Sequence, residues 1–188
     1  MKIAVDLDDT LADSLTSFIE FYNKNYKPKI KYEDFIAYTL NEIIGISKEE
    51  ENKILEQFDN SKYCDEVKPI KGAVEAIKKI IKKHEIVVIT QRLKRFETKT
   101  RLWLAKYFPE IKDVFFIRNE YHKLVKSKAE ICKEIGADIL IDDAISNVVA
   151  CEKAGIKVIV INYPWNQNKI FGKLVRRVKS WEEIASLL

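Results

Sequence analysis

The chain opens with Met-Lys-Ile-Ala-Val-Asp-Leu-Asp-Asp-Thr, residues 1–10, in which an apolar run stops at a cluster of carboxylates. An apolar run that ends at turn-forming acidic residues predicts a buried strand followed by its loop. Side chains alternate along an extended strand, so Asp6 and Asp8 serve one site only if the chain turns after Asp6. Carboxylates this close repel one another unless a cation lies among them, and oxygen ligands suit Mg²⁺.

Two later apolar runs also stop at polar groups. These runs, residues 85–89 and 138–141, are followed by Thr90, Gln91 and Arg92 and by Asp142 and Asp143. A solvated turn with a helix N-cap would explain the first acidic cluster alone, but it does not explain the same pattern at three strand ends. Ligands of open α/β sheets bind beyond the carboxyl ends of strands, so we predict that these groups share one site.

Strand and helix signals alternate along most of the chain. Strands separated by single helices predict parallel pairing, and therefore an α/β fold with a three-layer, Rossmann-like parallel sheet. The segment between the first two strands has helical periodicity and no strand pattern, so we expect a small helical cap over residues 15–70, with residues 1–14 and 71–188 forming the core. The expected strands are 3–5, 85–90, 113–117, 138–142 and 157–161, and the expected helices are 11–26, 32–40, 47–58, 73–83, 94–107, 127–135, 145–154 and a last one opened by Ser180.

Composition narrows the class of protein. The chain has 188 residues, 47% of them hydrophobic, and a formal net charge of +4. No apolar run has the length of a membrane span and the N-terminus does not resemble a signal peptide, so we expect a cytoplasmic protein without a membrane partner. The mild positive charge favours a small anionic ligand over a nucleic acid polymer. Three cysteines without a paired spacing indicate buried thiols rather than a nucleophile or a metal site.

The acidic motifs together resemble those of the haloacid dehalogenase superfamily of phosphotransferases. The resemblance consists of Asp6-x-Asp8-x-Thr10, Thr90, a lysine at a helix start and Asp142-Asp143, in that order. The phrase from Asp6 to Ser14, the helical insertion and the ending Ile141-Asp142-Asp143 look most like the pyrimidine 5′-nucleotidase, or 5′(3′)-deoxyribonucleotidase, branch. A carboxylic acid at Asp8 favours phosphate esters, because a halide leaves without a proton.

The resemblance implies roles for the acidic residues. Asp6 would be the nucleophile that forms an aspartyl-phosphate, and Asp8 would protonate the leaving alcohol and then deprotonate the attacking water. The Asp6 carboxylate, the Asp8 carbonyl and Asp142 would hold Mg²⁺, with Asp143 and Thr10 supporting the site.

Phosphate-binding groups are expected from two other segments. Thr90 would offer its hydroxyl and Gln91 its backbone N–H. Lys128 follows a predicted N-cap, as the lysine of the family does, while Lys126 and Lys123 are the alternatives. Arg92 has two equally weighted interpretations: it binds a second anionic group of the substrate, or it is a surface arginine.

The leading hypothesis is a Mg²⁺-dependent phosphomonoesterase for a small phosphorylated metabolite, with a nucleoside 5′-monophosphate as the best single substrate. The alternatives are a phosphatase for a sugar phosphate or another metabolite, and a non-catalytic phosphate-binding domain. The aromatic residues of the insertion would either stack on a base or pack in a core; they are Phe18, Phe21, Tyr22, Phe35 and Tyr38. His122, in a loop region, is a candidate for a substrate contact. Two tryptophans of the tail, Trp165 and Trp181, would either form a subunit contact or close the core. The oligomeric state is left open.

Overall fold

The computed structural model describes residues 1–36, 39–119, 121 and 123–188. Its sheet has six strands in the order β3-β2-β1-β4-β5-β6, and every pair is parallel. The strands are β1 (Lys2–Val5), β2 (Glu85–Leu93), β3 (Val114–Arg118), β4 (Ile139–Asp142), β5 (Lys157–Ile161) and β6 (Val175–Val178). The three-layer parallel fold predicted from the alternating pattern is thereby confirmed.

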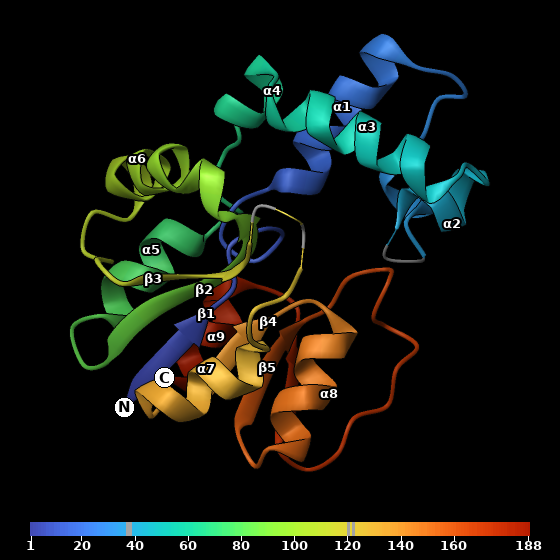
Figure 1. Ribbon diagram of the computed structural model, residues 1–188. Helices are drawn as coiled ribbons and strands as arrows, with labels where there is room; N and C mark the ends of the chain where they lie inside the picture. Colours follow the sequence, from blue (N-terminus) through green and yellow to red (C-terminus); the bar gives the residue numbers. More distant parts are fainter. Residues whose placement is uncertain (37–38, 120, 122) are drawn as a thin grey trace.

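Helices cover both faces of this sheet (Figure 1). The elements between and after the strands are α5 (Ala73–Ile80), η2 (Lys94–Phe96), α6 (Glu97–Tyr107), α7 (Lys128–Ile135), α8 (Ile145–Lys153) and α9 (Trp181–Leu187). Alternate strand residues point to opposite faces. Thus Ile3 and Val5 of β1 join one core cluster with α5, α6 and α9, while Ala4 joins the other with α7 and α8.

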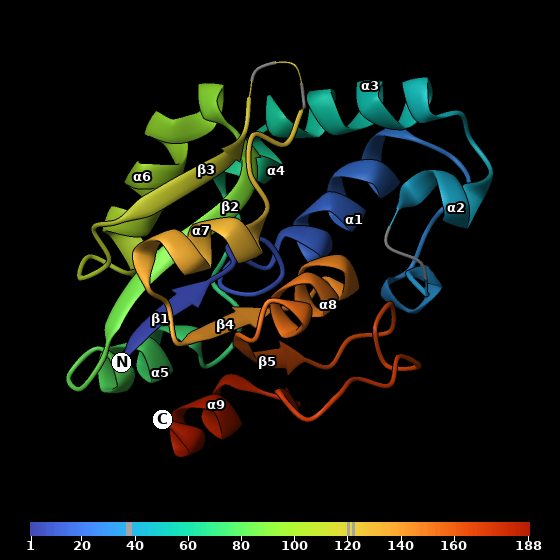
Figure 2. The same cartoon turned by 60° about the horizontal axis from the view of Figure 1, so that its bottom comes forward.

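The insertion between β1 and β2 is helical. It contains α1 (Ser14–Asn25), η1 (Tyr32–Asp34), α2 (Leu40–Ile44), α3 (Lys48–Asp59) and α4 (Lys62–Asp65). These helices lie beyond the carboxyl ends of the strands, as the two cartoon views show (Figures 1 and 2). Phe18 and Phe58 of the insertion belong to the same buried cluster as Ile3 and Val5 of the sheet, so the insertion packs directly onto the core.

The two ends of the insertion lie side by side. The N–H of Asp13 donates to the carbonyl of Lys68 and the N–H of Ile70 donates to that of Leu11, both at 2.8 Å. The chain therefore leaves and re-enters the sheet region at one place.

Most expected elements are present, with boundaries shifted by at most three residues. The helix expected over 32–40 is wrong: within the described part of this segment there is only the short η1, and Leu40 begins α2 rather than ending a helix. The reason is tertiary, because the carboxylate of Glu51 on α3 accepts the N–H groups of Leu40 and Asn41 at 2.7 and 3.3 Å and so caps the start of α2. Tyr38 and His122, which carried sequence predictions, lie outside the described residues.

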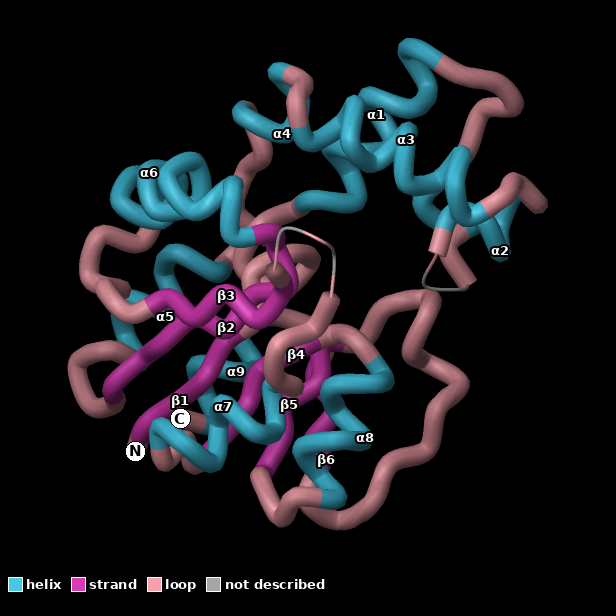
Figure 3. Tube along the Cα trace, in the orientation of Figure 1, coloured by secondary structure: helices cyan, strands magenta, loops and turns pink. Residues whose placement is uncertain are grey.

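The tail also differs from the sequence prediction. The basic segment 173–179 contains strand β6, which was not predicted, and it lies at the edge of the sheet (Figure 3). Charged residues such as Arg176 are typical of edge strands, which must avoid pairing with other chains. Trp181 is fully buried and its indole N–H donates to the carbonyl of Thr10 at 2.8 Å, so this tryptophan closes the core. No helix among the described residues is long and apolar enough to cross a membrane.

Candidate active site

The site lies at the point in the sheet where the strand order reverses, between β1 and β4. After β1 the chain proceeds to β2 on one side, and after β4 it proceeds to β5 on the other, so the crevice between β1 and β4 is the topological switch point. The register aligns Val5 with Ile141, and the N–H of Asp6 donates to the carbonyl of Ile141 at 2.9 Å. Asp6 and Asp142 therefore leave adjacent strands at the same level.

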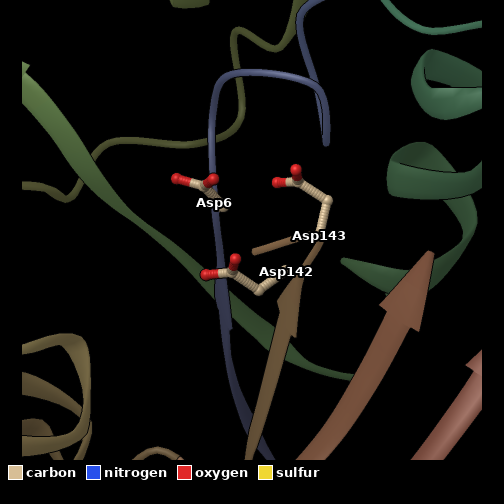
Figure 4. Close-up of side chains that lie close together, drawn as sticks. All are labelled: Asp6, Asp142 and Asp143. Carbon is tan, nitrogen blue, oxygen red and sulfur yellow. The ribbon is translucent and has the colours of Figure 1, made fainter. Parts of the chain in front are cut away.

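Three carboxylates meet at this point. Oxygens of Asp6, Asp142 and Asp143 lie within 4.8 Å of one another, and all three residues are buried. Figure 4 shows Asp6 at the end of β1 and the other two at the end of β4, with the carboxylates gathered in the same space. The sequence prediction that the first and fourth strand ends come together is confirmed.

One buried cation faces the carboxylates. Lys128, at the first position of α7, is 1% exposed, and its ammonium lies 2.5 Å from Asp6 and 2.7 Å from Asp142. Ser127 caps this helix by accepting the N–H of Glu130, which fixes where the lysine side chain begins. Of the alternative lysines, Lys126 pairs with Glu134 at the surface and Lys123 is exposed. Lys128 is thus the lysine that reaches the acids.

The charges of this cluster do not balance. Burial raises the pKa of Asp6 to about 7, with the neighbouring Asp142 adding to the rise and Lys128 opposing it. Burial likewise raises the pKa of Asp143, and the negative charges of Asp142 and Asp6 add to the effect. The pKa of Lys128 is raised despite burial, because it faces two carboxylates. Among the described residues, one ammonium faces three carboxylates, so the negative charge of the cluster favours a further cation.

Asp142 is held by several donors. Its oxygens accept the N–H of Ala144 at 2.9 Å and the amide of Asn147 at 3.1 and 3.2 Å, in addition to the lysine. Asn147 also accepts a hydrogen bond from the amide of Gln91 at 3.3 Å. Sequence reasoning missed Asn147. The available signal was its place one turn into the helix that follows Asp143, where the side chain points back toward the helix start.

Asp143 is held from the tail of the chain. Trp165 donates its indole N–H to Asp143 Oδ2 at 2.9 Å, and the Thr10 hydroxyl lies 3.4 Å from Oδ1. The side chain of Asn166 donates to the carbonyl of Asp143 at 2.8 Å. The sequence left open whether Trp165 forms a subunit contact or closes the core, and the structure places it in the core cluster. Asn166 was missed because nothing local marks it.

The loop after β1 makes the turn that the sequence requires. The N–H groups of Leu11 and Ala12 both donate to the carbonyl of Leu7 at 2.8 Å. Asp9 adopts a left-handed conformation with φ of 55°, which aspartate tolerates better than most residues, and its carboxylate accepts the N–H of Leu15 at 2.8 Å. This turn brings Asp8 back toward the sheet.

Asp8 forms an ion pair with Arg92. The guanidinium donates through Nη2 to Oδ1 at 2.7 Å and through Nε to Oδ2 at 3.0 Å, and the Ser14 hydroxyl donates to Oδ1 at 2.5 Å. Burial works to raise the pKa of Asp8, but Arg92 and Ser14 outweigh it and the pKa lies below its usual range. Thr90 is fully buried beside this pair, and its hydroxyl oxygen accepts the N–H of Arg92 at 3.0 Å.

A cavity of about 410 Å³ opens over Asp8 and Arg92. This volume falls in the range of small-molecule sites. The described walls include aromatic residues from the insertion and from the core, namely Phe18, Phe35, Phe58, Phe96 and Trp165. Of the aromatic residues singled out in the sequence, Phe18 and Phe35 line the cavity, whereas Phe21 and Tyr22 are packed in the core. Cys64 also lines the cavity, and burial raises the pKa of its thiol to about 11.

Comparison with known proteins identifies the family. The family model described as 5′ nucleotidase, deoxy (pyrimidine), cytosolic type C protein matches residues 1–188. The chain belongs to this family. It is a phosphoric monoester hydrolase of the haloacid dehalogenase superfamily, in agreement with the sequence resemblance.

Individual relatives agree with the family. The chain is 29% identical over 184 residues to a 5′(3′)-deoxyribonucleotidase of Bacillus subtilis, covering 97% of this chain and 95% of that protein. It is 26% identical over 189 residues to a nucleotidase of Clostridium acetobutylicum, covering 100% and 93% of the two chains.

Solved structures share the fold. One is of a phosphoglycolate phosphatase, described as putative, from Lactobacillus delbrueckii subsp. bulgaricus, with a TM-score of 0.70 and 15% identity over 99% of this chain and 97% of that one. Another is of YfnB from Bacillus subtilis, described as a putative hydrolase and bound to magnesium, with a TM-score of 0.67 and 15% identity over 99% of this chain and 97% of that one.

Proposed function

We propose that this hydrolase is a Mg²⁺-dependent phosphomonoesterase that removes the phosphate of a nucleoside 5′-monophosphate through an aspartyl-phosphate on Asp6. The observation that carries the proposal is the buried cluster of three carboxylates and Lys128, joined to an aromatic-walled cavity through Asp8, which lines the cavity two residues after Asp6. A phosphate ester needs a nucleophile, compensation of negative charge and a proton for its leaving oxygen. A flat aromatic wall suits the nucleobase end of such a substrate.

The donor set fits a hard divalent cation. Carboxylate oxygens are the ligands that Mg²⁺ prefers, and the acids exceed the single ammonium that faces them. Asp6, Asp142 and the backbone carbonyl of Asp8 would hold the ion, with Asp143 and Thr10 supporting them. Bound Mg²⁺ would offset the repulsion between the anionic nucleophile and the anionic phosphate.

Asp6 and Asp8 carry the two halves of the reaction. In the first half, an Asp6 oxygen forms a bond to phosphorus while the ester P–O bond breaks, and the leaving oxygen takes a proton from Asp8. In the second half, water attacks phosphorus and gives a proton to Asp8, while the bond from phosphorus to Asp6 breaks and restores the carboxylate. Inorganic phosphate and the alcohol are the products.

The phosphate oxygens would be bound by three groups of the protein. The Thr90 hydroxyl accepts a backbone N–H, which leaves its own hydrogen free to donate to the substrate. The backbone N–H of Gln91 and the ammonium of Lys128 would complete the set. Arg92 is hydrogen-bonded to Asp8, and this contact competes with the hypothesis that Arg92 binds an anionic group of the substrate.

We further propose that residues 15–70 act as a cap over a core formed by 1–14 and 71–188. The cavity is bounded by both parts, with Phe18 and Phe58 on the insertion and Phe96 and Trp165 on the core. A small substrate that enters between them would be shielded from water during the reaction. The cap would therefore determine which leaving group the site accepts, while residues of the core catalyse the phosphoryl transfer.

The test is phosphate release from a panel of nucleoside monophosphates, sugar phosphates and other small esters, with Mg²⁺ and with a chelator. We expect Mg²⁺-dependent release with the highest kcat/KM on pyrimidine (deoxy)nucleotides. Higher kcat/KM on sugar phosphates or other esters would reject the nucleotide assignment and keep the phosphatase mechanism. Equal rates with Mg²⁺ and chelator would reject the metal requirement.

A further inference from the structure

The two oxygens of the Asp8 carboxylate are in different surroundings. Oδ1 accepts the Ser14 hydroxyl at 2.5 Å and Arg92 Nη2 at 2.7 Å, with Arg92 Nε at 3.2 Å as a third contact. Among the residues that the structure describes, Oδ2 accepts a hydrogen bond only from Arg92 Nε, at 3.0 Å. A carboxylate oxygen has two acceptor sites, so Oδ1 is saturated whereas Oδ2 keeps one site free. The Asp8 side chain is 37% exposed and lines the cavity, which gives Oδ2 access to a ligand there.

Arg92 is itself fixed in place. Its side chain is 14% exposed, Nη1 lies 3.4 Å from the hydroxyl of the fully buried Thr100, and its backbone N–H is bound by Thr90. The pairing of β2 with β3 shifts register between Thr90 and Leu93. Such an irregularity turns a side chain away from the regular strand direction, here toward Asp8, which is 84 residues distant in the sequence.

We infer that Arg92 is a positioning residue which, together with Ser14, occupies Oδ1 of Asp8 and leaves Oδ2 as the oxygen that exchanges the proton. This inference rests on the proposed function. The negative charge of a bound ester favours the protonated form of Asp8, so Oδ2 takes up a proton in the complex and passes it to the leaving oxygen when the ester P–O bond breaks. When water attacks the phosphorylated Asp6, the free site on Oδ2 receives the proton of that water. A carboxylate that rotated freely would present either oxygen in many directions, and the proton transfer would lose its alignment.

The role differs from phosphate binding in its dependence on the leaving group. A residue that binds phosphate supports all esters alike, whereas a residue that aligns the proton donor matters only where the leaving oxygen needs a proton. Nitrophenolate leaves without taking up a proton, whereas phenolate or an alkoxide depends on a proton from the acid. The kcat/KM value reports the steps up to the first phosphoryl transfer and therefore isolates this half of the reaction.

The experiment measures kcat/KM for substituted phenyl phosphates, from p-nitrophenyl phosphate to phenyl phosphate, in the wild type, Arg92→Gln, Ser14→Ala and Asp8→Asn. For Arg92→Gln we expect a loss of about 10²-fold on phenyl phosphate and of less than about threefold on p-nitrophenyl phosphate. Ser14→Ala should show the same pattern with a smaller loss, and Asp8→Asn the same pattern with a larger one. Arg92→Lys should restore part of the activity on phenyl phosphate.

Arg95→Gln is the matched control. Arg95 lies three positions further along, is exposed and faces Glu56 at 3.8 Å, so its loss should leave the leaving-group dependence unchanged. Equal losses of Arg92→Gln on all esters would overturn the inference in favour of phosphate binding, and unchanged rates would overturn it outright. Ser14→Ala carries the same test if Arg92→Gln fails to fold. Retained activity of Asp6→Asn would reject the proposed function, whereas an unchanged leaving-group dependence in Arg92→Gln alone would reject only the positioning role.

Discussion

The ammonium of Lys128 lies 2.7 Å from Asp142 Oδ2, and both side chains are almost completely buried. Such a pair gains little when intact, because both charges have been removed from water, but the loss of one partner is costly. The same ammonium also compensates Asp6, so a single side chain neutralises charge at the ends of both β1 and β4.

Replacing this lysine should therefore strongly destabilise the folded protein. We expect Lys128→Met to lower the free energy of unfolding by about 3–5 kcal/mol without metal, because it leaves buried carboxylates uncompensated. Lys126→Met is the control: its ion pair with Glu134 is at the surface, and the expected change is within about 1 kcal/mol. Urea unfolding measures both. Equal losses in the two variants would contradict the assignment of the buried charge.

Asp6→Asn should abolish turnover while the fold persists. The amide is nearly the same size as the carboxylate but does not form an acyl phosphate, so we expect kcat to fall by at least about 10⁴-fold. Asp113→Asn serves as a control, since the exposed Asp113 precedes β3 at the amino end of the strand, whereas Asp6 and Asp142 lie at the carboxyl ends of theirs. Phosphate release and far-UV circular dichroism give the two readouts. Activity within tenfold of the wild type would reject Asp6 as the nucleophile.

Mg²⁺ should stabilise the folded chain through Asp142. A ligand that binds only the folded state adds about 2.7 kcal/mol at 100 times its Kd, so the wild-type Tm should rise with Mg²⁺ concentration. In Asp142→Asn this rise should largely disappear, because one of the three clustered carboxylates is gone. Thermal unfolding at several Mg²⁺ concentrations is the measurement, with Asp113→Asn again as the control. An undiminished rise in Asp142→Asn would place the ion elsewhere.

Asp59 should make stability depend on pH. Burial raises the pKa of this carboxyl to about 6, with Asp8 adding to the rise and Arg92, Arg95 and Lys99 opposing it. Because the unfolded pKa is about 3.9, the protonated form is favoured by the fold, and stability is lost as pH rises from about 4 through 6. Asp59→Asn removes this loss and should be more stable than the wild type by about 1 kcal/mol at pH 7, since water screens part of the charge.

The pH profile of urea unfolding tests this expectation. The advantage of Asp59→Asn over the wild type should shrink toward zero below pH 4, where Asp59 is protonated in both states. A difference that stays constant between pH 4 and pH 7 would show that the substitution acts through something other than ionisation.

The sequence predicted that Asp6 and Asp142 lie at one edge of a parallel sheet, but not that their two strands are adjacent. Apolar runs mark buried parallel strands, and parallel strands all present their carboxyl ends at one edge, so Asp6 and Asp142 had to be neighbours once β1 and β4 were paired. Lys128 could be chosen because the N-cap at Ser127 is a local signal.

Other contacts have no local signature. The pairing of Trp165 with Asp143 depends on a loop 22 residues further along, and that of Arg92 with Asp8 depends on an irregularity in β2. The edge strand β6 has two arginines among its four residues, so its hydrophobic pattern was too weak to predict it. The false helix at 32–40 shows the same limit, since the cap supplied by Glu51 comes from a separate helix.

The paired segments at residues 11–13 and 68–70 have a consequence for how this chain can change. Closing a loop costs entropy that grows only slowly with its length, and here the core already holds the two ends together through hydrogen bonds between Asp13 and Lys68 and between Ile70 and Leu11. Changes in the length of the insertion therefore add little loop-closure entropy, as long as Phe18 and Phe58 keep their packing on the core. The architecture lets the walls of the cavity be lengthened, shortened or exchanged over evolutionary time while the acids beneath stay in register.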